Sequence, residues 1–488
     1  MTNKESSTLL LFGAKGNLAR VKLFPGLFKL DLAGKLHPEM KIVSIGRQEE
    51  SHENWLENLK SIIRAKYETD LDESALARFL KGNIYHANLP EDPNAFKKLS
   101  DRLIQEDFSQ NLAFFLSVRP SDFAWIIDQL AEVELLDETS HWKRVLIEKP
   151  FGVNSETAQT LQDSISKHLK ESQIYRIDHY LGKFALQNIL FTRFYNVLLE
   201  PIWNNQYIDH IQVTNHETLG VGDRTKFYDA TGALRDMMQS HILQTLTLAT
   251  MEKPKSFSPD DVRDEKIKLL NQITPVPIDD FEKYVYRAQY TSGSIRNEGD
   301  VKGYLEELGQ DSNVETYAAV KFFIENDRWK NVPIYLRTAK RLHENATYIS
   351  VKLKPIKTSN GIDSDNWIII SIQPKESIHF EINSRVPGLD DTQCRKILLD
   401  GGIRFDGDET IDSYEILLLD LIEGNQSRFL HIDEVKAQWK LIDPIIDKWQ
   451  DSSVPVFTYP AGSHDPESSK IIFENSDQFW RSSINIEN

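Results

Sequence analysis

A short apolar segment followed by a glycine-containing turn is the feature of this chain that most constrains its fold. The apolar segment is Leu9–Phe12, and it ends at Gly13. Leucines then recur at helical spacing, at positions Leu18, Leu23, Leu27 and Leu30. This pattern predicts a buried strand, a tight turn and a helix in that order, as at the start of a βαβ unit.

Strands and helices continue to alternate through the N-terminal part of the chain. Further strand candidates are Lys41–Ile45, Leu112–Val118 and Arg144–Ile147. Helical stretches lie around Asp122–Leu136 and Glu156–Leu169. The alternation predicts an α/β domain with a parallel sheet.

From about Ile208 the pattern changes, because strand-like segments follow one another with few helices between them. These segments are Ile208–Glu217, Glu315–Ile324, Ile334–Thr338, Tyr348–Leu353, Trp367–Ile372 and Ile378–Val386. They are predicted to be antiparallel. One long helical segment, Gly232–Met251, interrupts them near the start.

The length of the chain predicts more than one domain. A chain of 488 residues exceeds the size at which single hydrophobic cores stop growing. We expect residues 1–177 to form a nucleotide-binding domain and residues 178–488 to form a second domain. A cleft between two such domains is where a cofactor and a second substrate would meet.

Charge and cysteine content narrow the class of protein. The net charge of −17 argues against nucleic-acid binding, which needs a basic surface. Cys394 is the only cysteine, so the chain can form neither an intrachain disulfide nor a thiolate metal cluster, and no metal is expected. Its apolar runs are far shorter than a membrane span, and the N-terminus has no signal-peptide core. We therefore expect a cytoplasmic protein without membrane or nucleic-acid partners.

The turn after the first strand reads Gly13-Ala14-Lys15-Gly16-Asn17-Leu18-Ala19. Glycines between a strand and a helix let the backbone approach a pyrophosphate that lies on the helix N-terminus. The spacing is Gly-x-x-Gly, and not the commoner Gly-x-Gly, so a purely structural turn is the alternative interpretation. The candidate cofactor-binding residues are Gly13, Lys15, Gly16, Asn17 and Leu18.

The end of the second strand bears on the choice of cofactor. An acid there binds the ribose hydroxyls of NAD, whereas an arginine accommodates the extra phosphate of NADP. The strand ends in Gly46-Arg47-Gln48, so Arg47 favours NADP, with a solvated surface arginine as the alternative. Glu49 and Glu50 follow closely, which leaves use of NAD open.

The segment Arg176–Lys183 contains an acid, an imidazole, a phenol and an ammonium group. His179, Tyr180 and Lys183 can donate to the oxygens of a small polyanion. Asp178 would repel such a ligand unless it held a catalytic imidazole in one tautomer.

Oxidation of an alcohol needs a general base, and histidine suits that task near neutral pH. His241 lies with Asp236 on the apolar helical segment Gly232–Met251. A histidine in this setting is otherwise most often a satisfied core residue.

The segment Arg176–Lys183 resembles, residue for residue, the signature of the glucose-6-phosphate dehydrogenase family, and further matches span nearly the whole chain. The resemblance implies a Rossmann-like dinucleotide-binding domain followed by a larger α+β domain on a mainly antiparallel sheet. It also implies a homodimer. The implied reaction oxidises glucose 6-phosphate at C1 to 6-phosphoglucono-lactone with hydride transfer to NADP, and possibly to NAD.

The same resemblance implies roles for individual residues. His241 would be the catalytic base, and Asp178 would orient its ring. In the block Glu148-Lys149-Pro150-Phe151-Gly152, Lys149 would contact both substrate and cofactor, and Pro150 would be a hinge. The implied substrate-binding residues are Lys149, His179, Tyr180, Lys183, Glu217, Asp236 and Lys340.

The chain also departs from the family pattern. The departures are Lys15 for Ser or Thr, Asn17 for Asp, Arg119 for Pro, Ser240 for Asn, Ala339 for Gly and Asn345 for a second basic residue. His343 could partly compensate for Asn345 when protonated. The departures leave two alternatives open, which are a catalytically weak paralogue that binds sugar phosphate or nucleotide and a dehydrogenase of another sugar. Asp178 and His241 together favour the enzyme, because a binding protein needs no paired base and carboxylate.

Overall fold

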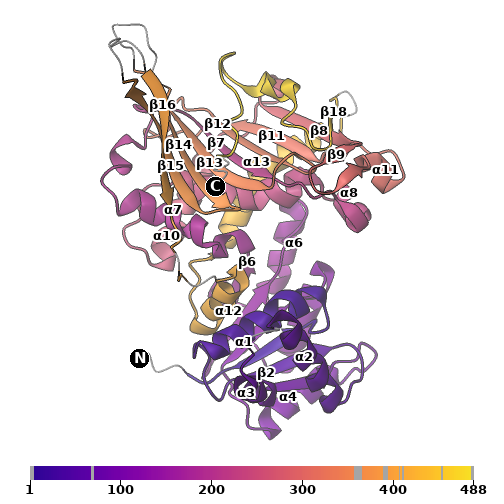
Figure 1. The fold of residues 1–488 in the computed structure, drawn as a ribbon. Helices are drawn as coiled ribbons and strands as arrows, with labels where there is room; N and C mark the ends of the chain where they lie inside the picture. The colour runs from indigo at the N-terminus through magenta and orange to yellow at the C-terminus, as the bar shows by residue number, and fades with distance from the viewer. Residues whose placement is uncertain are drawn as a thin grey trace. The chain divides into compact units, whose positions relative to one another are not determined.

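The computed structural model of the chain describes residues 5–67, 71–356, 365–387, 394–405, 407–408, 411–451 and 454–484. The chain divides into two compact units. The parallel-sheet unit comprises Met1–Lys183, Ser256–Arg263 and Thr410–Val435, and the antiparallel-sheet unit comprises Phe184–Lys255, Asp264–Glu409 and Lys436–Asn488. Figure 1 shows the N-terminal residues of the first unit in indigo and purple.

The first unit is built on a seven-stranded sheet with the order β17-β6-β5-β4-β1-β2-β3. Its strands are β1 (Thr8–Phe12), β2 (Lys41–Gly46), β3 (Asn83–Ala87), β4 (Leu112–Leu116), β5 (Lys143–Ile147), β6 (Ile174–Ile177) and β17 (Phe429–Leu430). All pairs are parallel except β17 with β6. The predicted α/β unit with a parallel sheet is confirmed.

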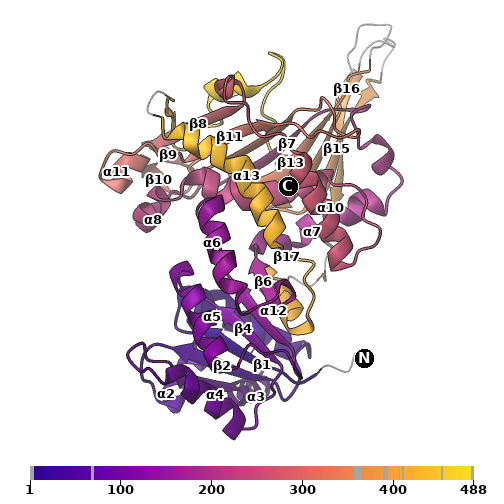
Figure 2. The same ribbon diagram turned by 180° about the vertical axis from the view of Figure 1, so that it is seen from behind.

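Helices cover both faces of this sheet. They are α1 (Phe24–Leu32), α2 (His52–Lys66), α3 (Glu73–Gly82), α4 (Ala95–Gln105), α5 (Phe123–Glu132), α6 (Ser155–Ile165) and α12 (Ser413–Glu423). α1 packs with α2, α3 and α12, whereas α5 packs with α6 on the face seen in Figure 2. Every residue of β1 and β4 is buried, as expected for strands covered on both sides.

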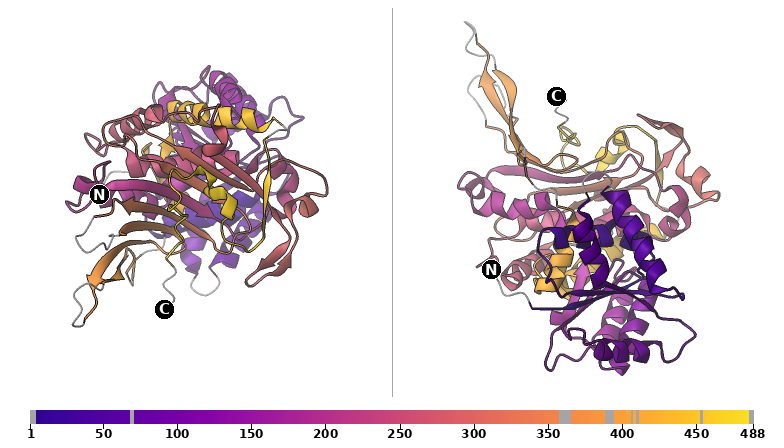
Figure 3. Two further views of the ribbon diagram at one scale, coloured as in Figure 1. Left: turned by 90° about the horizontal axis from the view of Figure 1, so that it is seen from above. Right: turned by 60° about the horizontal axis from the view of Figure 1, so that its bottom comes forward.

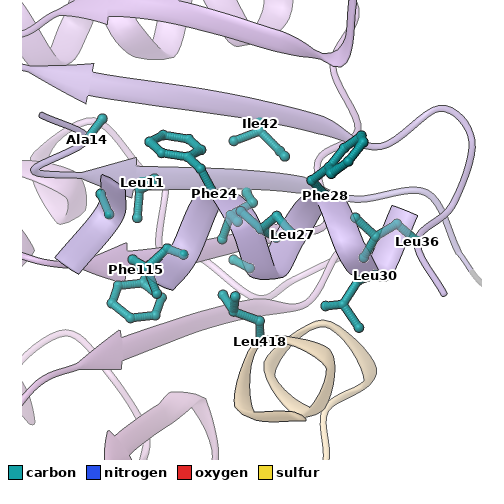
Figure 4. Packing of buried hydrophobic residues seen from close by; sticks show 14 of the residues in the cluster. Leu11, Ala14, Phe24, Leu27, Phe28, Leu30, Leu36, Ile42, Phe115 and Leu418 are labelled. Atoms are coloured by element: carbon teal, nitrogen blue, oxygen red, sulfur yellow. The ribbon is translucent and has the colours of Figure 1, made fainter. Parts of the chain in front are cut away.

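The hydrophobic core between α1 and the sheet explains the helical spacing of the N-terminal leucines. Leu23, Leu27 and Leu30 are buried with Leu11 of β1 against the sheet, and Leu418 of α12 closes the cluster (Figure 4). Apolar side chains at helical spacing form one stripe, so a single helix face is removed from water. This packing holds the turn at Gly13 between β1 and the helix.

The second unit is built on a nine-stranded sheet with the order β16-β15-β14-β13-β7-β12-β11-β8-β18. Its strands are β7 (Ile208–His216), β8 (Val285–Thr291), β11 (Tyr317–Phe322), β12 (Ile334–Ala339), β13 (Ala346–Leu353), β14 (Trp367–Gln373), β15 (Ser377–Arg385), β16 (Cys394–Gly402) and β18 (Phe457–Pro460). A separate hairpin joins β9 (Gly293–Ile295) and β10 (Gly299–Val301). Figure 3 shows β15 and β16 together at one edge of the large sheet.

The predicted antiparallel arrangement is right for most of these pairs and wrong for one pair of predicted strands, β7 and β12. They are parallel neighbours, with Ile211 opposite Ile334 and His216 opposite Ala339. Parallel neighbours need a long crossover, and the chain between them supplies one that contains helices and the strands β8 to β11. β18 is likewise parallel to β8.

The remaining α-helices are α7 (Phe184–Phe194), α8 (Thr225–Asp229), α9 (Leu243–Thr250), α10 (Pro259–Gln272), α11 (Tyr304–Leu308) and α13 (Ile432–Trp449). A π-helix at Ala19–Leu23 leads directly into α1. Short 3₁₀ turns lie at Pro120–Asp122, Glu171–Gln173, His179–Gly182, Glu200–Ile202, Gly222–Arg224, Phe281–Lys283 and Glu467–Ile472. None of the helices within the described ranges is both long enough and apolar enough to cross a membrane.

The predicted helix Gly232–Met251 is present, but its first half is not an α-helix. Leu234–Ile242 forms a π-helix, which continues directly into α9. The buried Glu315 caps its start, because its Oε1 accepts a hydrogen bond of 2.9 Å from the Leu234 amide. A Cβ on Gly232 would lie 2.4 Å from the same carboxylate, so glycine is needed at this entry.

Candidate cofactor and substrate sites

The turn after β1 requires the glycine that the sequence places there. Gly13 has φ +79°, and a Cβ at this position would lie 2.0 Å from the carbonyl oxygen of Ser117. The Gly13 amide donates to the carbonyl of Ile45 over 3.1 Å, and the Gly16 amide donates back to Gly13 over 2.8 Å. The turn is therefore hydrogen-bonded to β2 and packed closely against Ser117, which follows β4.

A cavity of about 720 Å³ lies beside this turn. Its lining residues are Phe12, Gly13, Lys15, Gly16, Ile45, Gly46, Arg47, Gln48, Asn88, Pro90, Ser117, Val118, Arg119, Asp122, Trp125 and Ile126. Most of these residues lie at or just after the carboxyl ends of parallel strands, where ligands of α/β sheets bind, and Trp125 and Ile126 come from α5. Of the sequence candidates, Gly13, Lys15, Gly16 and Arg47 line the cavity. Asn17 is exposed and Leu18 packs against the core, and neither belongs to the lining.

Lys15 is exposed, but two neighbours hold its ammonium. Its ammonium lies 2.8 Å from a carboxylate oxygen of Glu50 and 5.1 Å from the ring centroid of Tyr85. The hydrogen bond to Glu50 raises the pKa of Lys15 and outweighs the opposing effect of burial. Tyr85 is itself held in place, because its hydroxyl donates to the Gln48 carbonyl over 2.7 Å. The basic residue that distinguishes this turn is therefore charged and oriented from within the same unit.

Sequence reasoning missed several residues of this cavity. Arg119 lies 3.2 Å from Asp122, and the half-exposed Trp125 stands in edge contact with Phe96. The available signal was position, because Arg119 follows β4 closely, and β4 is the parallel neighbour of β1. The contact between Lys15 and Glu50 had no such signal, since it depends on how the two loops fold.

The cavity fits a phosphorylated dinucleotide by its chemistry. Its volume lies within the usual range for cofactor pockets, and the glycines Gly13 and Gly46 are part of its lining. Lys15 and Arg47 bring positive charge to an otherwise acidic chain. A guanidinium such as Arg47 can grip a phosphate through two parallel hydrogen bonds.

The segment after β6 brings the predicted phosphate donors together. Asp178 is fully buried, and its Oδ1 accepts a hydrogen bond of 3.0 Å from the Tyr180 amide. The Lys183 ammonium lies 3.7 Å from the ring centroid of Tyr180, and the His179 ring stands edge-on to that ring at 5.1 Å. A compact group of imidazole, phenol and ammonium therefore forms around the short 3₁₀ turn.

Glu148 and Lys149 follow β5 on the same unit. Burial raises the pKa of Glu148 to about 8, although a hydrogen bond with Tyr414 and the charge of Lys149 oppose this shift. One carboxylate oxygen of Glu148 has no access to solvent. The peptide bond between Lys149 and Pro150 is cis. Burial thus favours the neutral form of Glu148 beside the predicted substrate lysine.

Two predicted substrate residues of the antiparallel-sheet unit form an ion pair. Lys340 follows β12, Glu217 follows β7, and the Lys340 ammonium donates to the Glu217 carboxylate. Their backbones are joined as well, because the Glu217 amide donates to Ala339 over 2.9 Å. The parallel pairing of β7 with β12 therefore brings Glu217 and Lys340 together.

The predicted base lies on the π-helix. His241 is 4% exposed, and the Thr245 hydroxyl donates to its carbonyl over 2.8 Å. Residues five positions apart in an α-helix are separated by ~140° around the axis, since each residue turns it by ~100°. The wider i→i+5 turn brings Asp236 and His241 nearer to one face of the helix.

The loop after Lys340 differs from the expectation for His343. The Asn345 side chain is exposed, whereas the His343 ring lies 3.9 Å from the ring of His464. Burial lowers the pKa of His343, and the neighbouring His464 and His216 lower it further. His343 is therefore a poor substitute for a permanent cation near neutral pH.

A parallel α/β sheet with a glycine turn and a cation-lined cavity defines a dinucleotide-binding protein, here joined to a second unit on a large mixed sheet. The family model for the NAD binding domain of glucose-6-phosphate dehydrogenase matches residues 10–188, and the model for the C-terminal domain matches residues 190–481. The chain belongs to the glucose-6-phosphate dehydrogenase family.

Individual relatives agree with this assignment. The glucose-6-phosphate 1-dehydrogenase of Chlamydia pneumoniae is 38% identical, with 97% of this chain and 95% of the relative covered. That of Zymomonas mobilis is 37% identical, with 98% of this chain and 100% of the relative covered. A solved structure of glucose-6-phosphate dehydrogenase in complex with glucose 6-phosphate has a TM-score of 0.89 at 32% identity, and covers 99% of this chain and 100% of its own. The structure from Mycobacterium avium has a TM-score of 0.83 at 28% identity, with 99% of both chains covered.

Proposed function

We propose that this protein oxidises glucose 6-phosphate at C1 to 6-phosphoglucono-lactone, with NADP as the hydride acceptor. The observation that carries the proposal is the match, over nearly the full length of both chains, to relatives named glucose-6-phosphate 1-dehydrogenase. A solved relative with the same fold holds glucose 6-phosphate. The cation-lined cavity supports use of a phosphorylated dinucleotide. Neither a weak paralogue nor a dehydrogenase of another sugar is favoured by these relatives.

The proposed chemistry needs one base and one orienting acid. Bound NADP supplies a nicotinamide ring that accepts the C1 hydride. His241 takes the proton of the C1 hydroxyl as the hydride leaves. The C1–O single bond then becomes the carbonyl double bond of the lactone. Asp178 holds the imidazole in one tautomer and stabilises its protonated form. The burial of both residues supports these roles, because buried groups keep a fixed orientation.

The remaining candidate residues of this site bind the substrate in the proposal. In the proposal His179, Tyr180 and Lys183 hold the phosphate, and their grouping around one turn supports this role. Glu217 and Asp236 accept hydrogen bonds from sugar hydroxyls, and Lys340 contacts the same substrate. The ion pair between Glu217 and Lys340 presents a donor and an acceptor side by side.

For the cofactor we propose contacts from the N-terminal residues 1–177, and for the substrate mainly from residues 178–488. The proposed cofactor-binding residues are Gly13, Lys15, Gly16, Asn17, Leu18, Arg47 and Lys149. Lys149 would reach both ligands.

We further propose a cytoplasmic homodimer, which light scattering coupled to size-exclusion chromatography and cell fractionation can test.

The decisive experiment follows the absorbance of reduced cofactor. Purified protein is supplied with glucose 6-phosphate or glucose, each with NADP and with NAD. We expect rapid reduction with glucose 6-phosphate and at most slow reduction with glucose, because only the former carries the phosphate. His241→Asn under the same conditions controls for a contaminating dehydrogenase. Equal rates with both sugars, or no reduction by soundly folded protein, would refute the proposal.

A further inference from the structure

Three cationic side chains line the cofactor cavity, Lys15, Arg47 and Arg119, and two of them form an ion pair with a carboxylate. Lys15 is held by Glu50 at 2.8 Å and Arg119 by Asp122 at 3.2 Å. Arg47 is exposed at the end of β2 and has no ion pair among the described residues. The charge that a phosphate would meet in this cavity is therefore already partly compensated by the chain itself.

Glu50 holds Lys15 from outside the cavity wall. Lys15 belongs to the lining and Glu50 does not. The Glu50 side chain is 17% exposed and that of Lys15 is 34% exposed, so their pair is partly shielded from water and salt. The ring of Tyr85 adds a second restraint on the ammonium, and it is pinned by its hydrogen bond to Gln48. Together these contacts fix where the Lys15 charge lies and how much of it remains uncompensated.

The ion pair between Lys15 and Glu50 bears on the choice between NADP and NAD. NADP differs from NAD by a 2′-phosphate, which carries a charge of about −1.5 to −2 near neutral pH. An uncompensated lysine would favour the phosphate strongly, whereas a lysine that is already bound to a carboxylate favours it less. NAD lacks the 2′-phosphate, and the contact with Glu50, three residues after Arg47, holds the Lys15 ammonium beside the end of β2, where that phosphate is expected. The binding of NAD should therefore depend less on the compensation than the binding of NADP.

We propose that Glu50 is a positioning residue for cofactor specificity, which lowers the preference for NADP over NAD by holding Lys15 and so lets the cavity accept both. The inference rests on the proposed function in that it assumes a nicotinamide dinucleotide in this cavity. It assigns to Glu50 a role that acts only through Lys15.

The test measures binding of two nucleotide fragments and needs no catalysis. Dissociation constants for 2′,5′-ADP and 5′-AMP are measured by calorimetry, with quenching of tryptophan fluorescence as a second readout. Glu50→Gln should tighten binding of 2′,5′-ADP ~10-fold and change binding of 5′-AMP less than about 2-fold. Glu50→Asp, which keeps the charge, should restore most of the wild-type ratio. Lys15→Met should weaken binding of 2′,5′-ADP, and adding Glu50→Gln to it should have almost no further effect.

A matched control removes the same charge elsewhere in the unit. Glu73 forms an exposed ion pair with Arg64 at 2.8 Å and does not line the cavity. Glu73→Gln should leave the ratio of the two dissociation constants unchanged. Thermal unfolding of each variant confirms that binding is measured on folded protein.

Several results would overturn the inference. These are an unchanged ratio in Glu50→Gln, an equal gain for both fragments, or a gain that persists in the Lys15→Met background, since the last would mean that Glu50 acts by its own charge. The fragments report on the cavity alone. A protein that shows the expected ratio without oxidising glucose 6-phosphate would refute the proposed function and uphold the role of Glu50.

Discussion

Lys340 and Glu217 form an ion pair at the carboxyl ends of two parallel strands, β12 and β7. The Lys340 side chain is 8% exposed and that of Glu217 is 29% exposed. Removal of one partner from a pair of this kind leaves the other charge without compensation in a partly dry site. The pair is therefore expected to matter for stability as well as for substrate binding.

Glu217→Gln should lower the free energy of unfolding of the protein by about 1–3 kcal/mol, less than for a fully buried pair because Glu217 is partly exposed. The measurement is urea unfolding followed by tryptophan fluorescence. Lys340→Met and the double variant complete a double-mutant cycle. A double variant as unstable as the sum of the two singles would show that the pair contributes no coupling energy.

His241→Asn should lower kcat ~10²–10⁴-fold with a much smaller effect on KM, because the base acts in the transition state. Asp178→Asn should also lower kcat, because the wrong imidazole tautomer is then favoured. Steady-state kinetics with saturating NADP provide the test. His52→Asn, at an exposed position in the first turn of α2, serves as the control. Near wild-type kcat in His241→Asn would remove this residue from the role of base.

Arg47→Ala should raise the KM for NADP and leave the KM for NAD nearly unchanged, because only NADP carries the 2′-phosphate that a guanidinium can grip through paired hydrogen bonds. Arg64→Ala removes the same charge from an exposed site outside the cavity and should change neither constant. Parallel rises in both KM values would instead assign Arg47 a structural role.

Stability should fall at acidic pH through Glu344. Burial raises the pKa of this carboxyl, but the His216 ring at 3.5 Å and a hydrogen bond from the Ser483 hydroxyl outweigh burial and lower the pKa to about 2. A depressed pKa stabilises the fold above the unfolded value near 4.5, and this contribution disappears as the pH falls from about 4.5 to 2. We expect up to about 3 kcal/mol to be lost over this range.

The measurement compares urea unfolding of the wild type and of Glu344→Gln at pH 6, 4 and 3. The difference between them should shrink as the pH falls, because the variant has no carboxylate to protonate. Glu282→Gln, at an exposed position, is the control. A difference that stays constant with pH would contradict the assignment.

Asn345→Arg should lower the KM for glucose 6-phosphate, because a charge-assisted hydrogen bond contributes ~1.5–3 kcal/mol, or roughly 10-fold or more in affinity. Because burial lowers the pKa of His343, less of this residue is protonated at pH 6 than of an ordinary histidine. The gain should therefore differ less between the two pH values than it would beside an ordinary histidine. KM titrations at the two pH values test this, and an unchanged KM would show that position 345 does not face the substrate.

The N-terminal unit could be predicted in detail because its signals are local. Leu9–Phe12 is apolar throughout since helices cover both faces of β1, and Leu23, Leu27 and Leu30 mark the one face of the helix that packs on it. The same locality holds for the candidate site. His179, Tyr180 and Lys183 are neighbours in sequence, so a single short turn suffices to gather them.

The second unit was harder to predict from the sequence, because strand direction and helix type depend on residues that are distant in the chain. A run of strand-like segments favours antiparallel neighbours, and nothing in Ile208–Glu217 or Ile334–Thr338 indicates that the two strands pair in parallel. The wider turn of Leu234–Ile242 is equally invisible in its spacing, which is that of an ordinary helix. Both features decide where Glu217, Lys340, Asp236 and His241 lie.

By itself the sequence determined the fold class, the family and the identity of most candidate residues, because burial patterns and short motifs are properties of consecutive residues. Only the tertiary structure decided which charges meet. Glu50 holds Lys15, and Glu217 holds Lys340, across separations of 35 and 123 residues. Ion pairs of this kind follow from how loops and strands come together in space, and a charged residue in sequence has many possible partners until the chain has folded.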